Sequence, residues 1–330
     1  MVGFNCWQES GAILEFFMKS FAVVFPGQGS QSVGMLESFM ANDIVAKTFE
    51  EANDALGYDL KKIVLTGPES ELNKTEITQP AILTASVAAY RAFVKALDGS
   101  EPRACAGHSL GEYSALVAAD AISFADAVRL VRLRGQAMQE AVPAGVGAMM
   151  AVLGLEDEVI INGCAQVSAE GDAVWAANFN TPGQVVISGA KDAVARAGEY
   201  FASQGARRCV PLPVSVPSHC PMMQSAADKL AAALSDISLA DASIPVYANV
   251  LAAPVVAQGA IIDCLVKQLI GSVRWVETVQ KMKADGIEAL IEVGPNKVLC
   301  GLNRKIDKTL ITGNISSDED IAKVLESLNA

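Results

Sequence analysis

Short apolar runs alternate with amphipathic helical segments through the first part of the chain. The run FAVVF at 21–25 is β-branched and aromatic and stops at Pro26 and Gly27, which is typical of a buried strand entering a tight loop. Residues 103–109 (RACAGHS) predict a second short strand. Helical patterns are predicted at 41–57, 78–97, 111–119 and 123–142. Strands that alternate with helices predict an α/β fold, with a parallel sheet covered on both faces.

The order of predicted strands and helices changes between residues 145 and 213. This segment is predicted to run strand, helix, strand, strand, helix, strand, with the turn signal TPG between the two central strands. That order is the pattern of ferredoxin-like domains. The sequence therefore predicts a large α/β domain of residues 18–144 and 214–330, into which a small ferredoxin-like domain of residues 145–213 is inserted.

The first 17 residues differ from the rest of the chain. They contain two Glu residues and no Lys or Arg, whereas a secretory signal peptide begins with a basic region. The stretch MKSFAVVFPGQGSQ from Met18 has a short polar lead followed by the first strand, as a natural start would. We therefore expect residues 1–17 to be an extension outside the fold.

The composition excludes several classes of protein. The chain of 330 residues is 51% hydrophobic and 19% charged, so it can bury a large core. Its net charge of −12 argues against nucleic-acid binding, which depends on Lys and Arg that neutralise phosphates. No apolar run reaches the ~20 residues of a membrane span. The seven cysteines include no C-x-x-C pair, which disfavours a metal site and favours reduced thiols in a cytoplasmic protein.

Gly107, Ser109 and Gly111 form the spacing G-x-S-x-G between a predicted strand and a predicted helix. A serine at this position lies on a sharp turn with its hydroxyl exposed for nucleophilic attack. The spacing alone is a weak signal, and a structural turn serine is the alternative. The flanking strand and helix favour Ser109 as a nucleophile.

A serine nucleophile needs a base within about 3 Å, and the chain contains only two histidines. His108 is next to Ser109 and projects elsewhere from the turn, so His219, in the loop SVPSHCP, is the candidate. A histidine that only packs locally is the alternative. The group that orients His219 is left open: it is either an acid, as in a triad, or a backbone carbonyl, as in a dyad. The acids between the two residues include Asp120, Asp126, Asp157, Asp172 and Asp192.

Two segments can supply N–H donors to a developing oxyanion. One is the backbone N–H of Leu110, which follows the candidate nucleophile at the start of a predicted helix. The other is the loop FPGQGSQ at 25–31, where Gly27 and Gly29 let the backbone approach a ligand closely. This loop lacks the third glycine of a dinucleotide fingerprint and the Lys of a P-loop, which disfavours a nucleotide site.

Arg134 interrupts the apolar stripe of the helix predicted at 123–142. Ala127, Val131 and Met138 share its face at helical spacing, so a buried guanidinium is expected. A buried charge is costly unless an anion pairs with it. A structural ion pair is one interpretation. The other is a guanidinium that binds a substrate carboxylate through two parallel hydrogen bonds.

From about Met18 to its end, the chain resembles the bacterial malonyl-CoA:acyl-carrier-protein transacylases, a family of fatty-acid synthesis. The resemblance rests on six motifs in order, which together are far more specific than G-x-S-x-G. They are FPGQGSQ, GHSLGEYSAL, RGQAMQ, NTPGQVVISG, SVPSHC and EVGPNKVL. The family fold is an α/β-hydrolase-like large domain with a ferredoxin-like insertion, in agreement with the pattern above. The extension before Met18 departs from the family.

Position by position, the resemblance implies a set of catalytic roles. Ser109 is the nucleophile that becomes malonylated. His219 is its base and then the acid for the leaving thiol, held by the backbone carbonyl of Gln268. Gln28 and Leu110 supply the N–H groups of the oxyanion hole.

The resemblance also implies a substrate, a partner and a reaction order. Arg134 pairs with the malonyl carboxylate and Met138 lines that pocket. Malonyl-CoA acylates the serine, and the phosphopantetheine thiol of acyl carrier protein then takes the malonyl group, with no metal or redox cofactor. We expect a monomeric cytoplasmic enzyme whose acidic carrier meets a local basic patch, for which Arg207 and Arg208 are one candidate.

Two other functions remain open at this point. An esterase or thioesterase would use the same Ser109 and His219 and would release the acyl group to water whether or not a carrier is present. A non-catalytic module that binds carrier protein is the third hypothesis, and the presence of both residues argues against it.

Overall fold

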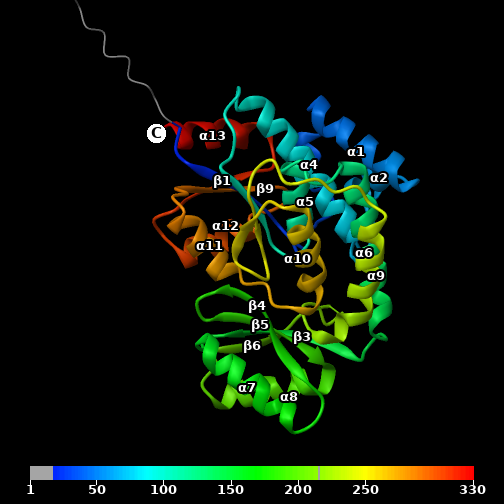
Figure 1. The fold of residues 1–330 in the computed structure, drawn as a ribbon, viewed down its shortest axis with the longest axis vertical. Helices are drawn as coiled ribbons and strands as arrows, with labels where there is room; N and C mark the ends of the chain where they lie inside the picture. Colours follow the sequence, from blue (N-terminus) through cyan, green and yellow to red (C-terminus); the bar gives the residue numbers. More distant parts are fainter. Residues whose placement is uncertain (1–17, 215) are drawn as a thin grey trace, which may run out of the picture.

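The computed structural model describes residues 18–214 and 216–330, which form two β-sheets with helices packed on them (Figure 1). The six-stranded sheet lies in the larger, upper part of this view, and the four-stranded sheet lies below it. The extension expected at residues 1–17 lies outside the described residues. Within 18–214 and 216–330, no helix is both long enough and apolar enough to cross a membrane.

The larger sheet has the strand order β10-β9-β1-β2-β7-β8. Its strands are β1 (Phe21–Phe25), β2 (Ala104–Gly107), β7 (Val246–Ala248), β8 (Ala253–Val255), β9 (Ala289–Val293) and β10 (Ile311–Ile315). All neighbours pair in parallel except β7 and β8, which are antiparallel at one edge. The predicted α/β fold class, a parallel sheet accompanied by a second small one, is confirmed.

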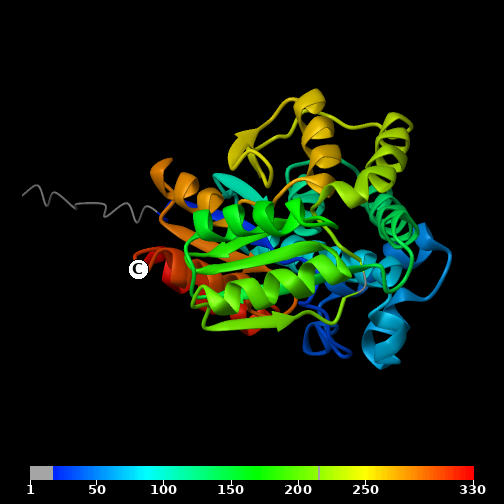
Figure 2. The same cartoon turned by 90° about the horizontal axis from the view of Figure 1, so that it is seen from below.

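The smaller sheet has the order β4-β5-β3-β6 and is antiparallel throughout. Its elements follow the predicted β-α-β-β-α-β order: β3 (Gly147–Leu153), α7 (Asp157–Ala169), β4 (Val174–Thr181), β5 (Gln184–Ala190), α8 (Lys191–Ser203) and β6 (Arg208–Pro211). Helices α7 and α8 pack on one face around an apolar cluster of their own (Figure 2). We propose 145–213 as the limits of this domain, and 18–144 with 214–330 as those of the large one.

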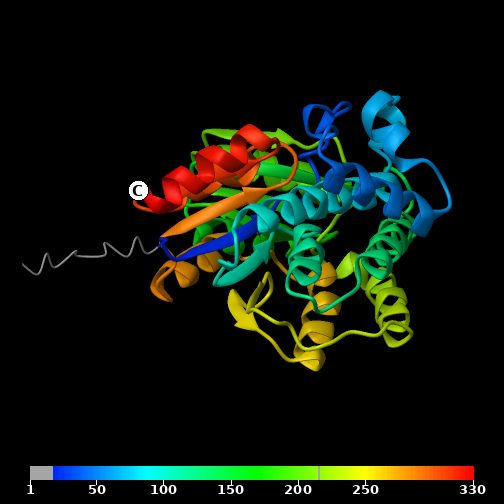
Figure 3. The same ribbon diagram turned by 90° about the horizontal axis from the view of Figure 1, so that it is seen from above.

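Alternate residues of β1 point to opposite faces of the larger sheet, as the two-residue period of a strand requires. Phe21, Val23 and Phe25 enter the larger core, and Ala22 and Val24 enter a smaller one. The larger core is closed by α1 (Asp43–Leu56), α4 (Thr75–Ala96), α5 (Gly111–Ala118), α6 (Phe124–Ala141), α9 (Gln224–Ser235), α10 (Gln258–Ile270) and α13 (Asp318–Asn329). The smaller core is closed by α11 (Trp275–Ala284) and α12 (Val298–Ile306). Figure 3 shows α13 in red beside the orange and blue strands.

Several elements were not predicted from the sequence. They are η1 (Glu37–Phe39), α2 (Leu60–Thr66), α3 (Glu69–Leu72), β8, β10, α12 and α13. The helical pattern PMMQSAADKLAAAL at 221–234 corresponds to η2 (Pro221–Met223) followed by α9. β10 reads ITGNI, whose Gly and Asn are poor strand formers, and it is a strand because it pairs with β9. β8 contains Pro254 and lies at the sheet edge, where a missing N–H is tolerated.

Backbone pairing ties the small sheet to the large domain next to α11. The N–H of Phe179 in β4 donates to the carbonyl of Val273 at 2.9 Å, and the N–H of Val273 donates to the carbonyl of Ala177 at 2.8 Å. These bonds add one residue of the large domain to the edge of β4. The face of the small sheet opposite α7 and α8 is therefore held over the carboxyl end of the large sheet.

Candidate active site

Ser109 lies on the sharp turn between β2 and α5, at the carboxyl end of a central strand. Its φ of 52° is in the left-handed region, which costs a non-glycine residue roughly 1–2 kcal/mol. The turn also needs glycine on both sides. A Cβ on Gly111 would lie 2.0 Å from the carbonyl oxygen of Phe25, and one on Gly107 would lie 1.9 Å from the backbone of Gly111. This is the strand-to-helix geometry that the G-x-S-x-G spacing predicts.

His219 is the histidine that faces Ser109. Its Nε2 lies 2.8 Å from Ser109 Oγ, and its Nδ1 lies 2.8 Å from the backbone carbonyl oxygen of Gln268. A carbonyl oxygen only accepts, so Nδ1 carries the ring proton and Nε2 accepts from the serine hydroxyl. Among the described residues, no carboxylate hydrogen-bonds to this ring. Of the two arrangements that the sequence leaves open, the geometry is that of a dyad.

The pKa of His219 leads to a prediction about pH dependence. Burial first, and the charge of Arg134 second, lower this pKa from 6.5 to about 3. A base acts in its neutral form, and a lowered pKa moves the loss of that form to more acidic solution. We expect kcat/KM for acylation by malonyl-CoA to stay level from pH 8 to about pH 5. Stopped-flow acylation across this range, with circular dichroism to monitor folding, tests this, and an inflection near pH 6.5 would contradict it.

Two further side chains brace the turn that carries Ser109. Asn249, directly after β7, accepts from the Ser109 N–H through Oδ1 at 2.7 Å and donates from Nδ2 to the Gly107 carbonyl at 2.6 Å. Glu112, in the first turn of α5, is buried and accepts from the Asn249 N–H at 3.0 Å and from Gln268 Nε2 at 2.9 Å. These bonds hold the strained turn in place, since each uses a group that the turn or its neighbours would otherwise bury unpaired.

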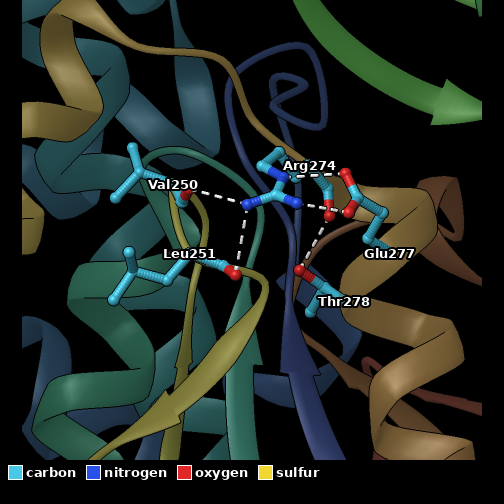
Figure 4. A network of polar contacts seen from close by, with 5 residues as sticks. All are labelled: Val250, Leu251, Arg274, Glu277 and Thr278. Atoms are coloured by element: carbon cyan, nitrogen blue, oxygen red, sulfur yellow. Dashed lines mark hydrogen bonds and ion pairs between the residues drawn. The ribbon is translucent and has the colours of Figure 1, made fainter.

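The loop that presents Asn249 is held by Arg274 (Figure 4). Nη1 of Arg274 donates to the carbonyl oxygens of Val250 and Leu251, at 3.4 and 3.3 Å. The other side of the guanidinium pairs with Glu277, with Nε donating to Oε1 at 2.7 Å. The backbone N–H of Arg274 also donates to the Asn249 carbonyl at 3.0 Å. The start of α11 thus fixes the loop after β7, and with it the amide that supports the nucleophile turn.

Arg134 projects from α6 and is only 1% exposed. Its Nη2 lies 3.3 Å from Ser109 Oγ and 3.0 Å from Gln268 Oε1, and its Nη1 donates to Gln79 Oε1 at 2.7 Å. The ring of Tyr113 lies 5.4 Å from the guanidinium carbon. None of the ion pairs within residues 18–214 and 216–330 includes Arg134. A structural ion pair would need a carboxylate next to Arg134, and this part of the chain places none there.

Gln28 and Leu110 lie on two loops that meet beside Ser109. Leu110 is the N-cap residue of α5, and Gln28 is in the loop after β1. The loops approach closely, because a Cβ on Gly27 would lie 2.4 Å from the carbonyl oxygen of His108. In the described part of the chain, neither backbone N–H donates to a protein carbonyl. Both are the kind of unused donor that can stabilise an oxyanion.

A cavity of about 720 Å³ joins these groups. Six of the residues singled out from the sequence line it, namely Gln28, Ser109, Leu110, Arg134, Met138 and His219. Gln268 lies behind His219. The small sheet contributes Asn178 and Asn180 to the opposite wall, where Asn180 Oδ1 lies 2.8 Å from His108 Nε2. The cavity therefore lies between the two sheets. Within the described ranges, no group of three or more His, Cys, Asp or Glu is placed to hold a metal ion.

Sequence reasoning missed Gln79, Glu112 and Asn249. Asn249 follows β7 at the carboxyl end of the sheet, where ligand-binding residues of open α/β sheets gather, and that position is a usable signal. Glu112 and Gln79 read as ordinary polar residues of helices, yet Glu112 is 2% exposed and Gln79 is fully buried. Their burial depends on long-range packing, so no local pattern marks them.

The fold and the cavity together define an α/β acyltransferase. A family model described as the acyl transferase domain matches residues 22–321, and the chain belongs to this family. It is 53% identical over 310 residues to the malonyl CoA-acyl carrier protein transacylase of Escherichia coli (strain K12), covering 94% of this chain and 100% of that relative.

Two solved structures agree with this assignment. The malonyl CoA-acyl carrier protein transacylase from Coxiella burnetii has a TM-score of 0.92 and 45% identity, over 95% of this chain and 99% of that one. A malonyl-transacylase in complex with its type II PKS acyl-carrier protein has a TM-score of 0.91 and 49% identity, over 94% of this chain and 100% of that one.

Proposed function

We propose that the protein transfers the malonyl group of malonyl-CoA to the phosphopantetheine thiol of acyl carrier protein, through a malonyl ester on Ser109, and so supplies fatty-acid synthesis. The observation that carries this proposal is the buried Arg134, whose guanidinium contacts Ser109 Oγ and has no carboxylate partner in residues 18–214 and 216–330. A nucleophile beside an uncompensated cation suits an acyl group that itself ends in a carboxylate. The names of the relatives support the same substrate and carrier.

In the first half-reaction, Ser109 Oγ attacks the thioester carbonyl carbon while its proton moves to His219 Nε2. The N–H groups of Gln28 and Leu110 stabilise the oxyanion of the tetrahedral intermediate. The C–S bond then breaks, and the sulfur of CoA takes the proton from His219. Arg134 pairs with the malonyl carboxylate, next to the side chain of Met138.

The second half-reaction reverses these steps with a different thiol. The phosphopantetheine thiol gives its proton to His219 and attacks the ester carbonyl, after which Ser109 Oγ leaves and recovers the proton. The carbonyl of Gln268 keeps the imidazole in the tautomer that both steps need. The first half-reaction replaces a sulfur by an oxygen at the acyl carbon and the second replaces that oxygen by a sulfur. The oxidation state of the carbon does not change, so the reaction needs no redox cofactor, and the proposal includes no metal. We propose that the enzyme is a monomer and works in the cytoplasm.

Transfer to the carrier tests this function. Labelled malonyl-CoA is incubated with the enzyme and either the carrier bearing phosphopantetheine or the same carrier without it. We expect labelled carrier only in the first mixture. An esterase or thioesterase, which the similarity to transacylases does not favour, would give free malonate at equal rates in both.

The exposed pair Arg207 and Arg208 at the start of β6 leads to a prediction about carrier binding. Because the carrier is acidic, replacing both residues with Glu is expected to raise the KM for the carrier about 10-fold at low salt, less at high salt. Steady-state kinetics at two ionic strengths measure this. Replacing Lys305 and Lys308 with Glu is the matched control, because this pair is also basic and exposed but lies on the large domain at the end of α12. Equal effects of the two double variants would contradict a local basic patch.

A further inference from the structure

The groups that hold Arg134 are amide oxygens. Gln79 from α4 and Gln268 from α10 are both fully buried, and each places its Oε1 on the guanidinium, at 2.7 and 3.0 Å. A guanidinium only donates, so both amides must present oxygen to it. The amide nitrogen of Gln79 then lies 3.5 Å from the sulfur of Met138, which is a weak acceptor.

Amide oxygens satisfy N–H groups without cancelling the charge. The carboxyl group of Glu112 belongs to the same network but forms no ion pair with Arg134. The side chain of Gln268 bonds to both residues, with its Nε2 donating to Glu112 at 2.9 Å, and burial raises the pKa of Glu112 to about 7. Arg134 Nε has no hydrogen-bond partner within the described part of the chain. A buried cation in this state is stabilised strongly by an incoming carboxylate, which brings the missing negative charge.

We propose that Gln79 is a specificity-determining positioning residue: its neutral amide fixes the guanidinium of Arg134 and keeps the positive charge available for the carboxylate of the acyl group. This inference rests on the proposed function. It identifies Gln79 rather than Gln268 as the residue to test, since the backbone of Gln268 also holds His219. Gln79 touches neither the serine nor the histidine, and its link to the reacting groups is its hydrogen bond to Arg134.

The substitution Gln79→Glu replaces one NH₂ group by oxygen and leaves the shape unchanged. It supplies Arg134 with a permanent carboxylate partner, which competes with the carboxylate of the substrate. We expect kcat/KM for acylation by malonyl-CoA to fall at least about 100-fold, largely through KM, and that for acetyl-CoA to change less than about 5-fold. Rapid-quench acylation followed by intact mass spectrometry gives both values.

Two matched variants show whether the loss comes from the new carboxylate at Arg134. One controls for the lost hydrogen bond, and the other controls for an added negative charge elsewhere on the protein. Gln79→Met removes the acceptor without adding charge, and we expect a smaller loss with malonyl-CoA, about 10-fold. Gln280→Glu makes the same chemical change on an exposed position of α11, outside the cavity lining, and we expect less than a 3-fold change. A merely structural role for Gln79 would lower malonyl and acetyl transfer together.

The outcomes are distinct. The decisive quantity is kcat/KM for malonyl-CoA divided by kcat/KM for acetyl-CoA. If this ratio is the same in Gln79→Glu and the wild type, the inference is overturned while the proposed function stays intact. The same holds if Gln79→Glu and Gln79→Met lose kcat/KM for malonyl-CoA equally. If the wild type itself transfers no malonyl group, the proposed function fails instead. If Gln79→Glu does not fold, the ratio in Gln79→Met decides: a fall of at least 3-fold supports the inference, and an unchanged ratio overturns it.

Discussion

Replacing Ser109 with alanine is expected to abolish the malonyl-enzyme and to lower malonyl transfer by at least about 10⁴-fold. The hydroxyl of Ser109 is the oxygen within 2.8 Å of the base, at a turn whose left-handed backbone aims it into the cavity. Without it, the thioester meets no nucleophile that His219 can activate. Intact mass spectrometry after mixing with malonyl-CoA detects the adduct, and transfer assays give the rate.

Ser114→Ala is the control for this change. Ser114 lies in the first turn of α5, is buried, and its hydroxyl has no partner within residues 18–214 and 216–330, so its loss should leave both folding and transfer near wild type. A malonyl adduct on Ser109→Ala would show that another residue is the nucleophile.

Replacing Arg134 with alanine is expected to lower kcat/KM for malonyl-CoA by roughly 10²–10³-fold and to leave acetyl transfer within about 5-fold of wild type. The guanidinium lies against Ser109 Oγ, and two buried glutamines hold it there. Only an acyl group with a terminal carboxylate uses that charge. Parallel assays with the two thioesters measure the change in specificity.

Arg129→Ala is the matched control on the same helix. Its side chain is 56% exposed and pairs with Asp126, so its removal should leave kcat/KM unchanged for both malonyl-CoA and acetyl-CoA. Equal losses of malonyl and acetyl transfer in Arg134→Ala would instead assign Arg134 a structural role.

The sequence predicts the fold where local pattern and tertiary structure agree. The apolar run at 21–25 predicts β1, and the changed order of elements at 145–213 predicts the separate small sheet; the structure contains both. β10 and β8 were missed because their residues are weak strand formers that depend on a neighbouring strand. The start of the helix predicted at 123–142 is also a local feature: α6 begins directly after Ser123, whose hydroxyl accepts from the Asp126 N–H.

The residues of the candidate site also fall into two groups, those that a local sequence pattern predicts and those that only the tertiary structure shows. Ser109, His219 and Arg134 could be chosen from sequence because each is locally unusual: a serine between glycines, a rare histidine, and a charge in an apolar stripe. Their mutual distances come from the tertiary structure, as do the supports that Asn249, Glu112 and Gln79 provide. A buried glutamine in a helix has no signature of its own, since only the fold shows what lies next to it.

The central claim is that the serine holds a malonyl group for a thiol and protects it from water. It is tested most directly by isolating the malonyl-enzyme, labelled in the acyl group and freed of CoA, and dividing it between buffer alone and buffer with phosphopantetheine-bearing acyl carrier protein. We predict that the label stays on Ser109 in buffer and moves to the carrier as soon as it is added. Release of free malonate at the same rate in both portions would contradict the account.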